Sequence, residues 1–254
     1  DYEKRISITP EIAKKYISNG FEVSIEKNLA SHLGISDNEF AKEGCKIESR
    51  ENVLAKSDVI LQLNLPDEKS TSLLKENNIL IGNFNTTSNK ENILKISNKN
   101  ISVFSMELLP RITRAQSMDI LSSQANLAGY KAVVDSFALF KKAIPMMMTA
   151  AGTISAAKVL VVGAGVAGLQ AIATAKRMGA IVFATDVRLA SKEQVESLGG
   201  KFLVVEGAEN LETEGGYAKE ASEDFKKKQE ELLKETLKKI DIVICTALIP
   251  GKKA

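Results

Sequence analysis

The chain has 254 residues, which is long enough for two ordinary domains that each bury a hydrophobic core. Its 34 Lys and Arg nearly balance its 32 Asp and Glu, so the net charge of +2 gives no sign of a surface for nucleic acid or an anionic membrane. No apolar run approaches the ~20 residues that cross a bilayer, and the sequence lacks an initiator Met and an apolar signal core, so we expect a soluble chain cut at both ends.

The first half of the sequence alternates helical and strand patterns. Residues 9–20 predict a helix, because an N-cap threonine and a proline at the first helical position precede an apolar face that ends at Asn-Gly. A strand is expected at 21–25. Near-continuous apolar runs, typical of buried parallel strands, follow at 58–65, 79–84 and 101–106. We therefore expect an N-terminal α/β domain over residues 1–130.

A long helix and a second set of strands follow. Small and apolar residues recur at helical spacing from 117 to 140, which indicates a closely packed helix that joins two domains. Beyond it, the patterns predict strands at 158–162, 181–185, 202–205 and 240–245, and helices at 167–177, 192–198 and about 219–239. This alternation is typical of a parallel, doubly wound sheet. We expect two α/β domains flanking a cleft, the second covering residues 131–254 and incomplete at its C-terminus.

The sharpest local motif is VLVVGAGVAGLQA, in which Gly163, Gly165 and Gly168 form G-x-G-x-x-G between a predicted strand and a predicted helix. The first glycine permits a tight turn, the second lets a pyrophosphate approach the backbone, and the third lets helix and strand pack closely. The helix N-terminus offers N–H groups and a positive dipole to the phosphates. The motif therefore predicts a Rossmann-type unit that binds a dinucleotide.

A carboxylate at the end of the next predicted strand indicates which dinucleotide is bound. Asp186 lies about 20 residues beyond the glycines, where such a side chain accepts hydrogen bonds from the adenosine ribose and repels a 2′-phosphate. Arg188 follows two residues later, and a guanidinium can also serve a 2′-phosphate. With Asp186 present, we expect Arg188 to stack near adenine and NAD(H) to be preferred to NADP(H).

The segment RITRAQSMDILSSQANLAGY concentrates polar side chains at the entry to the long predicted helix. They include Arg111, Gln116, Asp119 and Ser122, next to small apolar residues. Such a density of polar groups suits the wall of a ligand-binding cleft. An ion-pair network at a domain hinge would give the same composition, so both interpretations stay open on composition alone.

At these residues the chain resembles a known family. The segments RITRAQSMD, SSQANLAGYKAV, MTAAGT, KVLVVGAGVAGLQAIATAKRMGAIVFATDVR, KEQVESLGGKF, EGGYAKE and TALIPGK are similar to the alpha subunit of proton-translocating NAD(P) transhydrogenases. The resemblance covers essentially the whole chain and implies an NAD(H)-binding component, with NADP(H) on a partner domain or beta subunit. It also implies a homodimer, transmembrane partner domains that carry protons, and a peripheral position on the cytoplasmic or mitochondrial-matrix face of that membrane.

The resemblance further implies roles for individual residues. Four polar residues line the nicotinamide pocket in this comparison: Arg111, Gln116, Asp119 and Ser122, of which Arg111, Gln116 and Asp119 are the catalytic candidates. Asp119 and Ser122 are expected to hydrogen-bond the carboxamide and ribose, Arg111 to brace the ring, and Gln116 to face the NADP(H) domain. Tyr217 resembles the tyrosine of a loop that closes over the nucleotide. Further expected cofactor contacts are Gly163, Gly165, Val166, Gly168, Asp186, Val187, Arg188, Ala247 and Leu248, and no metal is expected.

Two other functions stay open. Alanine dehydrogenases share the fold, but they use a lysine in the strand written here DVILQLNLP and a histidine after the next strand, ILIGNFNTT. This chain has Gln62 and Asn64 in the first segment, its single histidine, His32, lies elsewhere, and Arg5 matches both families. Hydride transfer between two nicotinamides needs no acid or base, only two C4 atoms held close with water excluded. The other alternative is a non-catalytic NAD-binding module.

Sulfur-containing residues give no sign of redox chemistry. Cys45 and Cys245 are far apart and outside any C-x-x-C pattern, so we expect both to be buried structural thiols. The methionine run 146–148 is expected to provide adaptable packing at an interdomain surface.

Overall fold

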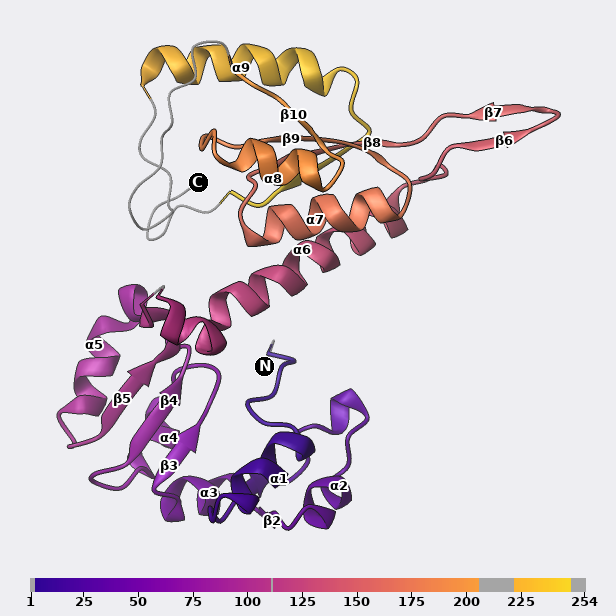
Figure 1. The fold of residues 1–254 in the computed structure, drawn as a ribbon. Coiled ribbons are helices and arrows are strands. Elements are labelled where there is room, and N and C mark those ends of the chain that lie inside the picture. The colour runs from indigo at the N-terminus through magenta and orange to yellow at the C-terminus, as the bar shows by residue number, and fades with distance from the viewer. Residues whose placement is uncertain (1–2, 111, 206–221, 248–254) are drawn as a thin grey trace. The chain divides into compact units, whose positions relative to one another are not determined.

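The structure of the chain is a computed structural model that describes residues 3–110, 112–205 and 222–247 (Figure 1). The chain forms two compact units, Asp1–Asp119 and Ile120–Ala254. Each unit contains parallel strands and helices that pack on them, so the predicted α/β class is confirmed. Within the described ranges, no helix combines the length and the apolar character needed to cross a membrane.

The first unit begins with two short parallel strands and the helices that cover them. In α1 (Pro10–Ser18), the Thr9 hydroxyl accepts a hydrogen bond from the Ile12 N–H at 3.4 Å, and the helix stops before Gly20, whose φ is +89°. The elements that follow are β1 (Ser24–Glu26), η1 (Ser31–Leu33), α2 (Asp37–Lys42), β2 (Lys46–Glu48) and α3 (Arg50–Lys56). Their core contains Ala13, Ile25 and Phe40. The predicted start and end of α1 are therefore confirmed.

A three-stranded parallel sheet forms the rest of the first unit, in the order β3-β4-β5. Its elements are β3 (Val59–Leu61), α4 (Glu68–Ser72), β4 (Ile79–Gly82), α5 (Thr86–Ser97), β5 (Ser102–Ser105), η2 (Met106–Leu108) and η3 (Thr113–Met118). Leu80 is fully buried in the central strand and packs in one cluster with Leu54 and Phe84. The carboxyl ends of these strands lead into polar segments, where the candidate site residues of this unit lie.

The second unit is a parallel four-stranded sheet with helices on both faces. Its elements are α6 (Ile120–Leu139), β6 (Met147–Thr149), β7 (Gly152–Ile154), β8 (Lys158–Val162), α7 (Val166–Arg177), β9 (Ile181–Thr185), α8 (Ser191–Ser197), β10 (Lys201–Phe202), α9 (Glu223–Leu237) and β11 (Ile242–Cys245). Figure 1 shows α7 and α8 on one face of the sheet and α9 on the other. The order β10-β9-β8-β11 places a switch point between β8 and β11, where such sheets bind ligands.

Helix α6 packs closely on α7 through a glycine. A Cβ atom built on Gly129 would lie only 2.0 Å from the Ala167 carbonyl oxygen. Glycine is therefore the residue that lets the backbones of the two helices meet here. Because Ala167 belongs to the first turn of α7, this contact also positions the helix end that carries the glycine motif.

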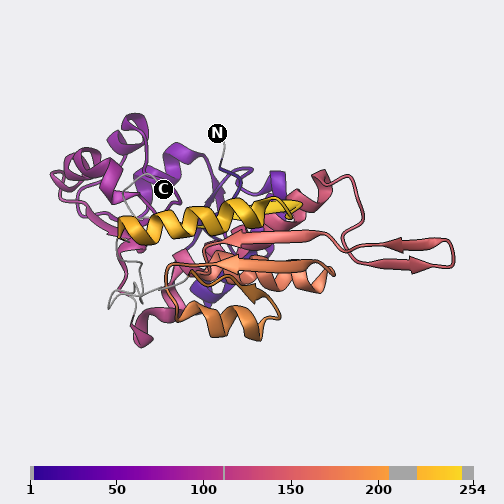
Figure 2. The same ribbon diagram turned by 90° about the horizontal axis from the view of Figure 1, so that it is seen from above.

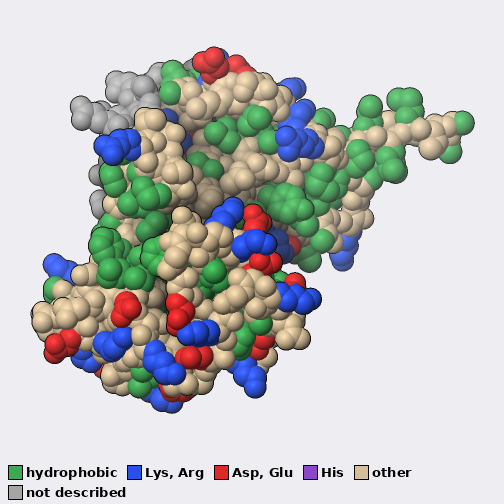
Figure 3. Space-filling model, turned by 60° about the horizontal axis from the view of Figure 1, so that its bottom comes forward, with side chains coloured by type: hydrophobic (Ala, Val, Ile, Leu, Met, Phe, Trp, Pro, Cys, Tyr) green, Lys and Arg blue, Asp and Glu red, His purple; other side chains and the backbone are tan. Residues whose placement is uncertain are grey.

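A β-hairpin that the sequence patterns did not predict projects from the second unit (Figure 2). Strands β6 and β7 pair antiparallel over three residues each. Met146, Met148 and Ile154 are 61%, 72% and 52% exposed, and Figure 3 shows hydrophobic side chains along this arm. In the chain by itself, the methionine run therefore lies on an exposed hairpin.

Several strands are shorter than their apolar patterns. The strand expected at 21–25 is β1 at Ser24–Glu26, and that expected at 202–205 is β10 at Lys201–Phe202. The runs at 79–84 and 202–205 extend beyond β4 and β10 because residues past the strand still pack on the core: Phe84 is 1% and Val205 is 5% exposed.

The two cysteines differ in environment. Cys45 is buried as predicted, but the prediction for Cys245 was wrong, since this thiol is exposed. Side chains alternate along β11, and Ile244 takes the buried side. Cys245 follows Ile244 and therefore points to the opposite side of the strand, where its thiol is exposed.

Candidate functional site

The glycine motif forms the tight turn between β8 and α7. Gly163 has φ +95°, and its N–H donates to the Thr185 carbonyl oxygen at 2.8 Å. A Cβ on Gly168 would lie 1.9 Å from the Gly163 carbonyl oxygen, closer than any side chain tolerates. These two glycines are therefore required by a positive φ and by close packing of helix against turn.

Gly165 differs from the other two, because among the residues that the structure describes its Cβ position is surrounded by open space. The nearest atom there is Arg188 Nη2 at 4.0 Å. Gly165 is also the N-cap of α7, and no side chain in the described part of the protein caps this helix end. The first N–H groups of this 12-residue helix, and the positive end of its dipole, therefore lie next to the space that a side chain at position 165 would fill. These residues fit an anionic pyrophosphate.

Asp186, directly after β9, is a buried carboxylate that accepts hydrogen bonds from this chain. Its Oδ1 accepts from the Arg188 backbone N–H at 2.8 Å and from Arg188 Nε at 2.9 Å. Its Oδ2 accepts from the Ala164 N–H at 2.7 Å and from Arg188 Nη2 at 2.9 Å. The side chain is only 6% exposed. Asp186 therefore joins the end of β9 to the glycine turn after β8.

These contacts also keep Asp186 charged. Burial acts to raise the pKa of Asp186, but the hydrogen bonds from Arg188 and from the Ala164 N–H hold that pKa below its ordinary value. The carboxylate is thus ionised at neutral pH. Arg188 pairs with Asp186 in the structure, and its expected stacking on adenine stays a prediction.

A support for the turn that sequence reasoning missed is Thr246, directly after β11. Its hydroxyl donates to the Gly163 carbonyl oxygen at 2.8 Å, and its N–H donates to the Val162 carbonyl oxygen at 2.8 Å. The segment TALIPGK, quoted above for its resemblance, was the available signal. The neighbouring Ala247 is exposed, and its backbone nitrogen lies 2.8 Å from the Cβ position of Gly163.

Two of the expected nicotinamide residues lie together in the first unit. Gln116 on η3 and Asp119 directly after it line a small cavity of about 190 Å³ with Leu109, Pro110 and Ala115. Gln116 is exposed and Asp119 is half-buried. Ser122 is half-buried in the first turn of α6, which belongs to the second unit.

The remaining predicted cofactor contacts divide into two groups. Val166 is exposed at the start of α7, and Val187 is half-buried between Asp186 and Arg188. Three others, Arg111, Tyr217 and Leu248, lie outside the described residues.

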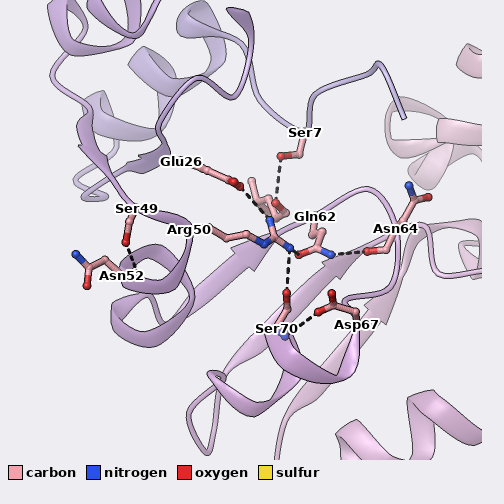
Figure 4. Close-up of polar contacts among 10 residues, drawn as sticks. Ser7, Glu26, Ser49, Arg50, Asn52, Gln62, Asn64, Asp67 and Ser70 are labelled. Atoms are coloured by element: carbon pink, nitrogen blue, oxygen red, sulfur yellow. Dashed lines mark hydrogen bonds and ion pairs between the residues drawn. The ribbon is translucent and has the colours of Figure 1, made fainter. Parts of the chain in front are cut away.

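Gln62, directly after β3, lies in a polar cluster of the first unit (Figure 4). Its Oε1 accepts a hydrogen bond from Arg50 Nη2 at 3.4 Å, and its Nε2 donates to the Asn64 carbonyl oxygen at 2.9 Å. Arg50 also contacts Glu26 Oε2 at 2.9 Å and Ser70 Oγ at 3.4 Å. Both ends of the Gln62 amide are thus engaged, and an amide has no proton to exchange in acid–base catalysis.

Arg5 and His32 are likewise engaged by the chain itself. Arg5 Nε and Nη2 donate to the two Glu3 carboxylate oxygens at 2.8 and 2.7 Å, and this lowers the pKa of Glu3 to about 2. His32 Nε2 lies 2.8 Å from the Lys4 carbonyl oxygen. The segments that contain β3 and β4 and the residues directly after them, 59–65 and 79–85, themselves contain neither a lysine nor a histidine.

The switch point, the glycine turn after β8 and the carboxylate after β9 define the class: an α/β protein with a Rossmann-type unit. More particularly, the chain belongs to the alanine dehydrogenase/transhydrogenase family. Residues 1–128 match the family's "Alanine dehydrogenase/PNT, N-terminal domain", and residues 132–254 match its "Alanine dehydrogenase/PNT, C-terminal domain".

Individual relatives place the chain on the transhydrogenase side of this family. It is 51% identical to an NAD(P) transhydrogenase subunit alpha protein of Rhodospirillum rubrum, over 99% of this chain and 68% of the relative. A solved transhydrogenase structure from Sinorhizobium meliloti superposes with a TM-score of 0.87 and 46% identity, over 99% of this chain and 68% of that one. Alanine dehydrogenase 1 of Staphylococcus aureus is 26% identical over 99% of this chain and 63% of the relative. The predicted resemblance to transhydrogenase alpha subunits is confirmed.

Proposed function

We propose that this chain is the NAD(H)-binding component of a proton-translocating NAD(P) transhydrogenase, in which it holds NAD(H) while a hydride passes to or from NADP(H) on a partner domain. The observation that carries the proposal is the 51% identity to a transhydrogenase subunit across 99% of the chain. The same length of chain is only 26% identical to an alanine dehydrogenase. The chain spans about two thirds of that transhydrogenase subunit, so the activity is proposed for the whole complex.

The adenosine half of NAD(H) binds to the second unit. The open space at Gly165 and the first turn of α7 receive the pyrophosphate, with Val166 beside it. The ionised Asp186 accepts hydrogen bonds from the ribose hydroxyls and repels a 2′-phosphate. Val187, Ala247 and Leu248 complete the contacts, by resemblance.

The nicotinamide half binds to the segment from Arg111 to Ser122. The Gln116 and Asp119 side chains, which line one cavity, supply polar groups for the ring and its carboxamide. Arg111 braces the ring, and Tyr217 closes over the nucleotide. Gln116, which is exposed, faces the NADP(H)-binding partner.

Direct hydride transfer asks little of the side chains beyond positioning. Bound NAD(H) supplies or accepts the hydride at its nicotinamide ring. The residues of this chain hold the ring in place and keep water away, and neither task needs a general acid or base. The engaged Gln62 amide fits this requirement, because it has no acid–base function to offer.

Assembly is a further element of the proposal. We expect a homodimer that joins an NADP(H)-binding domain or beta subunit and transmembrane proton-carrying domains, on the cytoplasmic or mitochondrial-matrix face of the membrane. The exposed apolar side chains of the β6–β7 hairpin support contact with a second copy, because burial of methionine and isoleucine favours association.

Binding measurements test the cofactor assignment first. NADH and NADPH are titrated separately into the complete protein, and the dihydronicotinamide fluorescence of each is followed. NADH should bind more tightly, and Gly165→Val should abolish this binding. Equal or tighter binding of NADPH would contradict the assignment. Addition of the NADP(H)-binding partner should then permit hydride transfer, and NADH binding without transfer would instead support a non-catalytic module.

Arg5 matches both branches of the family, so its presence does not favour the alternative of an alanine-type dehydrogenase. That alternative predicts that the complete protein reduces NAD with L-alanine. We expect no such activity, because the Arg5 guanidinium is paired with Glu3 and Gln62 stands where that chemistry uses a lysine.

A further inference from the structure

The Asp186 carboxylate has no acceptor position left for a ribose in the arrangement that the structure shows. An ionised carboxylate offers about four lone-pair positions for hydrogen bonds. Four N–H donors of this chain approach Asp186 at 2.7 to 2.9 Å, two on each oxygen. Ribose hydroxyls that bond to this carboxylate must therefore displace donors that are already present.

The guanidinium of Arg188 is the donor group that can leave. The other two donors, the N–H groups of Ala164 and Arg188, are backbone atoms of the turns after β8 and β9. The guanidinium stands on a flexible side chain that is 20% exposed. Its Nη2 also lies 4.0 Å from the Cβ position of Gly165, so it borders the space assigned to the pyrophosphate.

We propose that Arg188 sets the nucleotide specificity of this site, because its guanidinium and the adenosine ribose hydroxyls compete for the same oxygens of Asp186. The inference rests on the proposed NAD(H) site and adds a residue that acts through competition. A share of the energy of ribose binding is spent on breaking the Asp186–Arg188 pair. The 2′-hydroxyl therefore contributes less to affinity than it would at a free carboxylate.

The same pair keeps a second specificity hidden. While Asp186 is ionised, it holds Arg188 in a two-point contact and repels a 2′-phosphate. Loss of the charge on Asp186 removes both effects at once. Arg188 then no longer faces a charged carboxylate, and its guanidinium can turn toward a 2′-phosphate, which is the group that distinguishes NADP(H) from NAD(H).

Calorimetric titration of nucleotide fragments tests the competition. The complete protein and its Arg188→Gln variant are titrated with ADP and 2′-deoxy-ADP, which share the pyrophosphate and differ only in the 2′-hydroxyl. The Kd of 2′-deoxy-ADP divided by the Kd of ADP should rise about fivefold in Arg188→Gln, because the 2′-hydroxyl no longer competes with the guanidinium. Lys192→Gln, at an exposed position in α8, is the matched control: it removes one nearby charge without touching Asp186, and should leave the ratio unchanged. An unchanged or smaller ratio in Arg188→Gln overturns the inference.

Binding of 2′,5′-ADP tests the hidden specificity. Asp186→Asn keeps an acceptor oxygen for the Ala164 N–H and removes the charge. This variant should bind 2′,5′-ADP about tenfold more tightly than the unchanged protein, and the double variant with Arg188→Gln should lose the gain. A gain that persists in the double variant, or no gain in a folded Asp186→Asn protein, contradicts the role of Arg188. If Asp186→Asn does not fold, the ADP ratio in Arg188→Gln decides alone.

The outcomes for the two proposals are distinguishable. Unchanged protein that binds neither ADP nor NADH would overturn the proposed function and this inference with it. Binding of ADP with a 2′-hydroxyl contribution that does not depend on Arg188 would overturn the inference and leave the NAD(H) assignment intact.

Discussion

Replacement of Gly129 by alanine should loosen the packing of α6 on α7 and weaken NADH binding as a result. The added Cβ would lie 2.0 Å from the Ala167 carbonyl oxygen, 2.8 Å from its carbonyl carbon and 3.0 Å from its Cα. All three obstacles are backbone atoms, so no side-chain rotation relieves them. The two helices must separate by about 1 Å or more to restore ordinary contact distances.

Two effects of opposite sign determine the size of the change. Alanine favours a helix by about 1 kcal/mol relative to glycine, which by itself would stabilise α6. Overpacking a close contact costs about 1–3 kcal/mol, and backbone obstacles put this one at the upper end. We expect a net destabilisation of about 2 kcal/mol, equivalent to a fall in Tm of roughly 4–8 °C.

Denaturant unfolding and NADH titration of the complete protein measure both consequences. Ala128→Gly, at the exposed neighbouring position of α6, is the control. It should cost only the helix-propensity difference of about 1 kcal/mol and should not alter NADH affinity. A Gly129→Ala protein that is as stable as the unchanged one, or more stable, would refute the packing argument and show that helix propensity dominates.

Four further changes test other regions of the structure. Gly165→Ala should unfold at the same temperature as the unchanged protein but lose NADH affinity. Gly168→Ala, whose Cβ would lie 1.9 Å from a backbone carbonyl oxygen, should melt several degrees lower. Thermal melts in which Gly165→Ala is the less stable variant would contradict this interpretation. Because the folded pKa of Asp186 lies below its ordinary value, its stabilising effect is complete above about pH 4 and is lost as the pH falls through the folded pKa. The stability advantage over Asp186→Asn should therefore shrink below about pH 4 in urea titrations, and a constant advantage would argue against the pairing. Gln62→Lys should lower the free energy of unfolding by about 1 kcal/mol, since it places a second cation beside the Arg50 guanidinium. It should not create L-alanine oxidation, and NADH formation from L-alanine by this variant would contradict that expectation. Met148→Asp should shift the complete protein toward monomer in analytical ultracentrifugation, and an unchanged dimer would remove the hairpin from the proposed interface.

The strands of the second unit show how far local pattern predicts structure. The strands expected at 158–162 and 181–185 match β8 and β9 residue for residue, because each is a short, largely apolar run that is followed at once by a glycine or an aspartate, Gly163 and Asp186. The expected strand at 21–25 was displaced, since strand pairing with β2 selects Ser24–Glu26 and leaves Phe21 58% exposed. The apolar pattern predicts burial, and hydrogen bonding to a neighbour decides which residues form the strand.

The β6–β7 hairpin marks the limit of such patterns. Its strands contain three residues each and show no alternation of buried and exposed positions, because every residue in both is exposed. A period of two arises only where one face of a strand packs on a core. The sequence therefore carried no signal for this element beyond the methionines themselves.

The candidate site divides in the same way. The glycine motif and Asp186 could be recognised from spacing alone, because a turn with positive φ, a close approach and a carboxylate after the next strand each require a particular residue type. Two contacts of this site could not be predicted from the sequence. Asp186 accepts a hydrogen bond from the Ala164 N–H, 22 residues earlier, and the Thr246 hydroxyl donates to the Gly163 carbonyl oxygen, 83 residues earlier. Those contacts depend on how β8, β9 and β11 lie side by side.

The sequence by itself thus determined the class of fold, the family, and which residues are candidates for holding a dinucleotide. These properties reside in local periodicity and in residue types that few others can replace. Only the tertiary structure decided that Arg188 fills the acceptor positions of Asp186, that Gly129 sets the distance between α6 and α7, and that Cys245 is exposed. Each of these depends on which surfaces meet when segments distant in the sequence pack together. Such contacts cannot be inferred from the local sequence around any one of the residues.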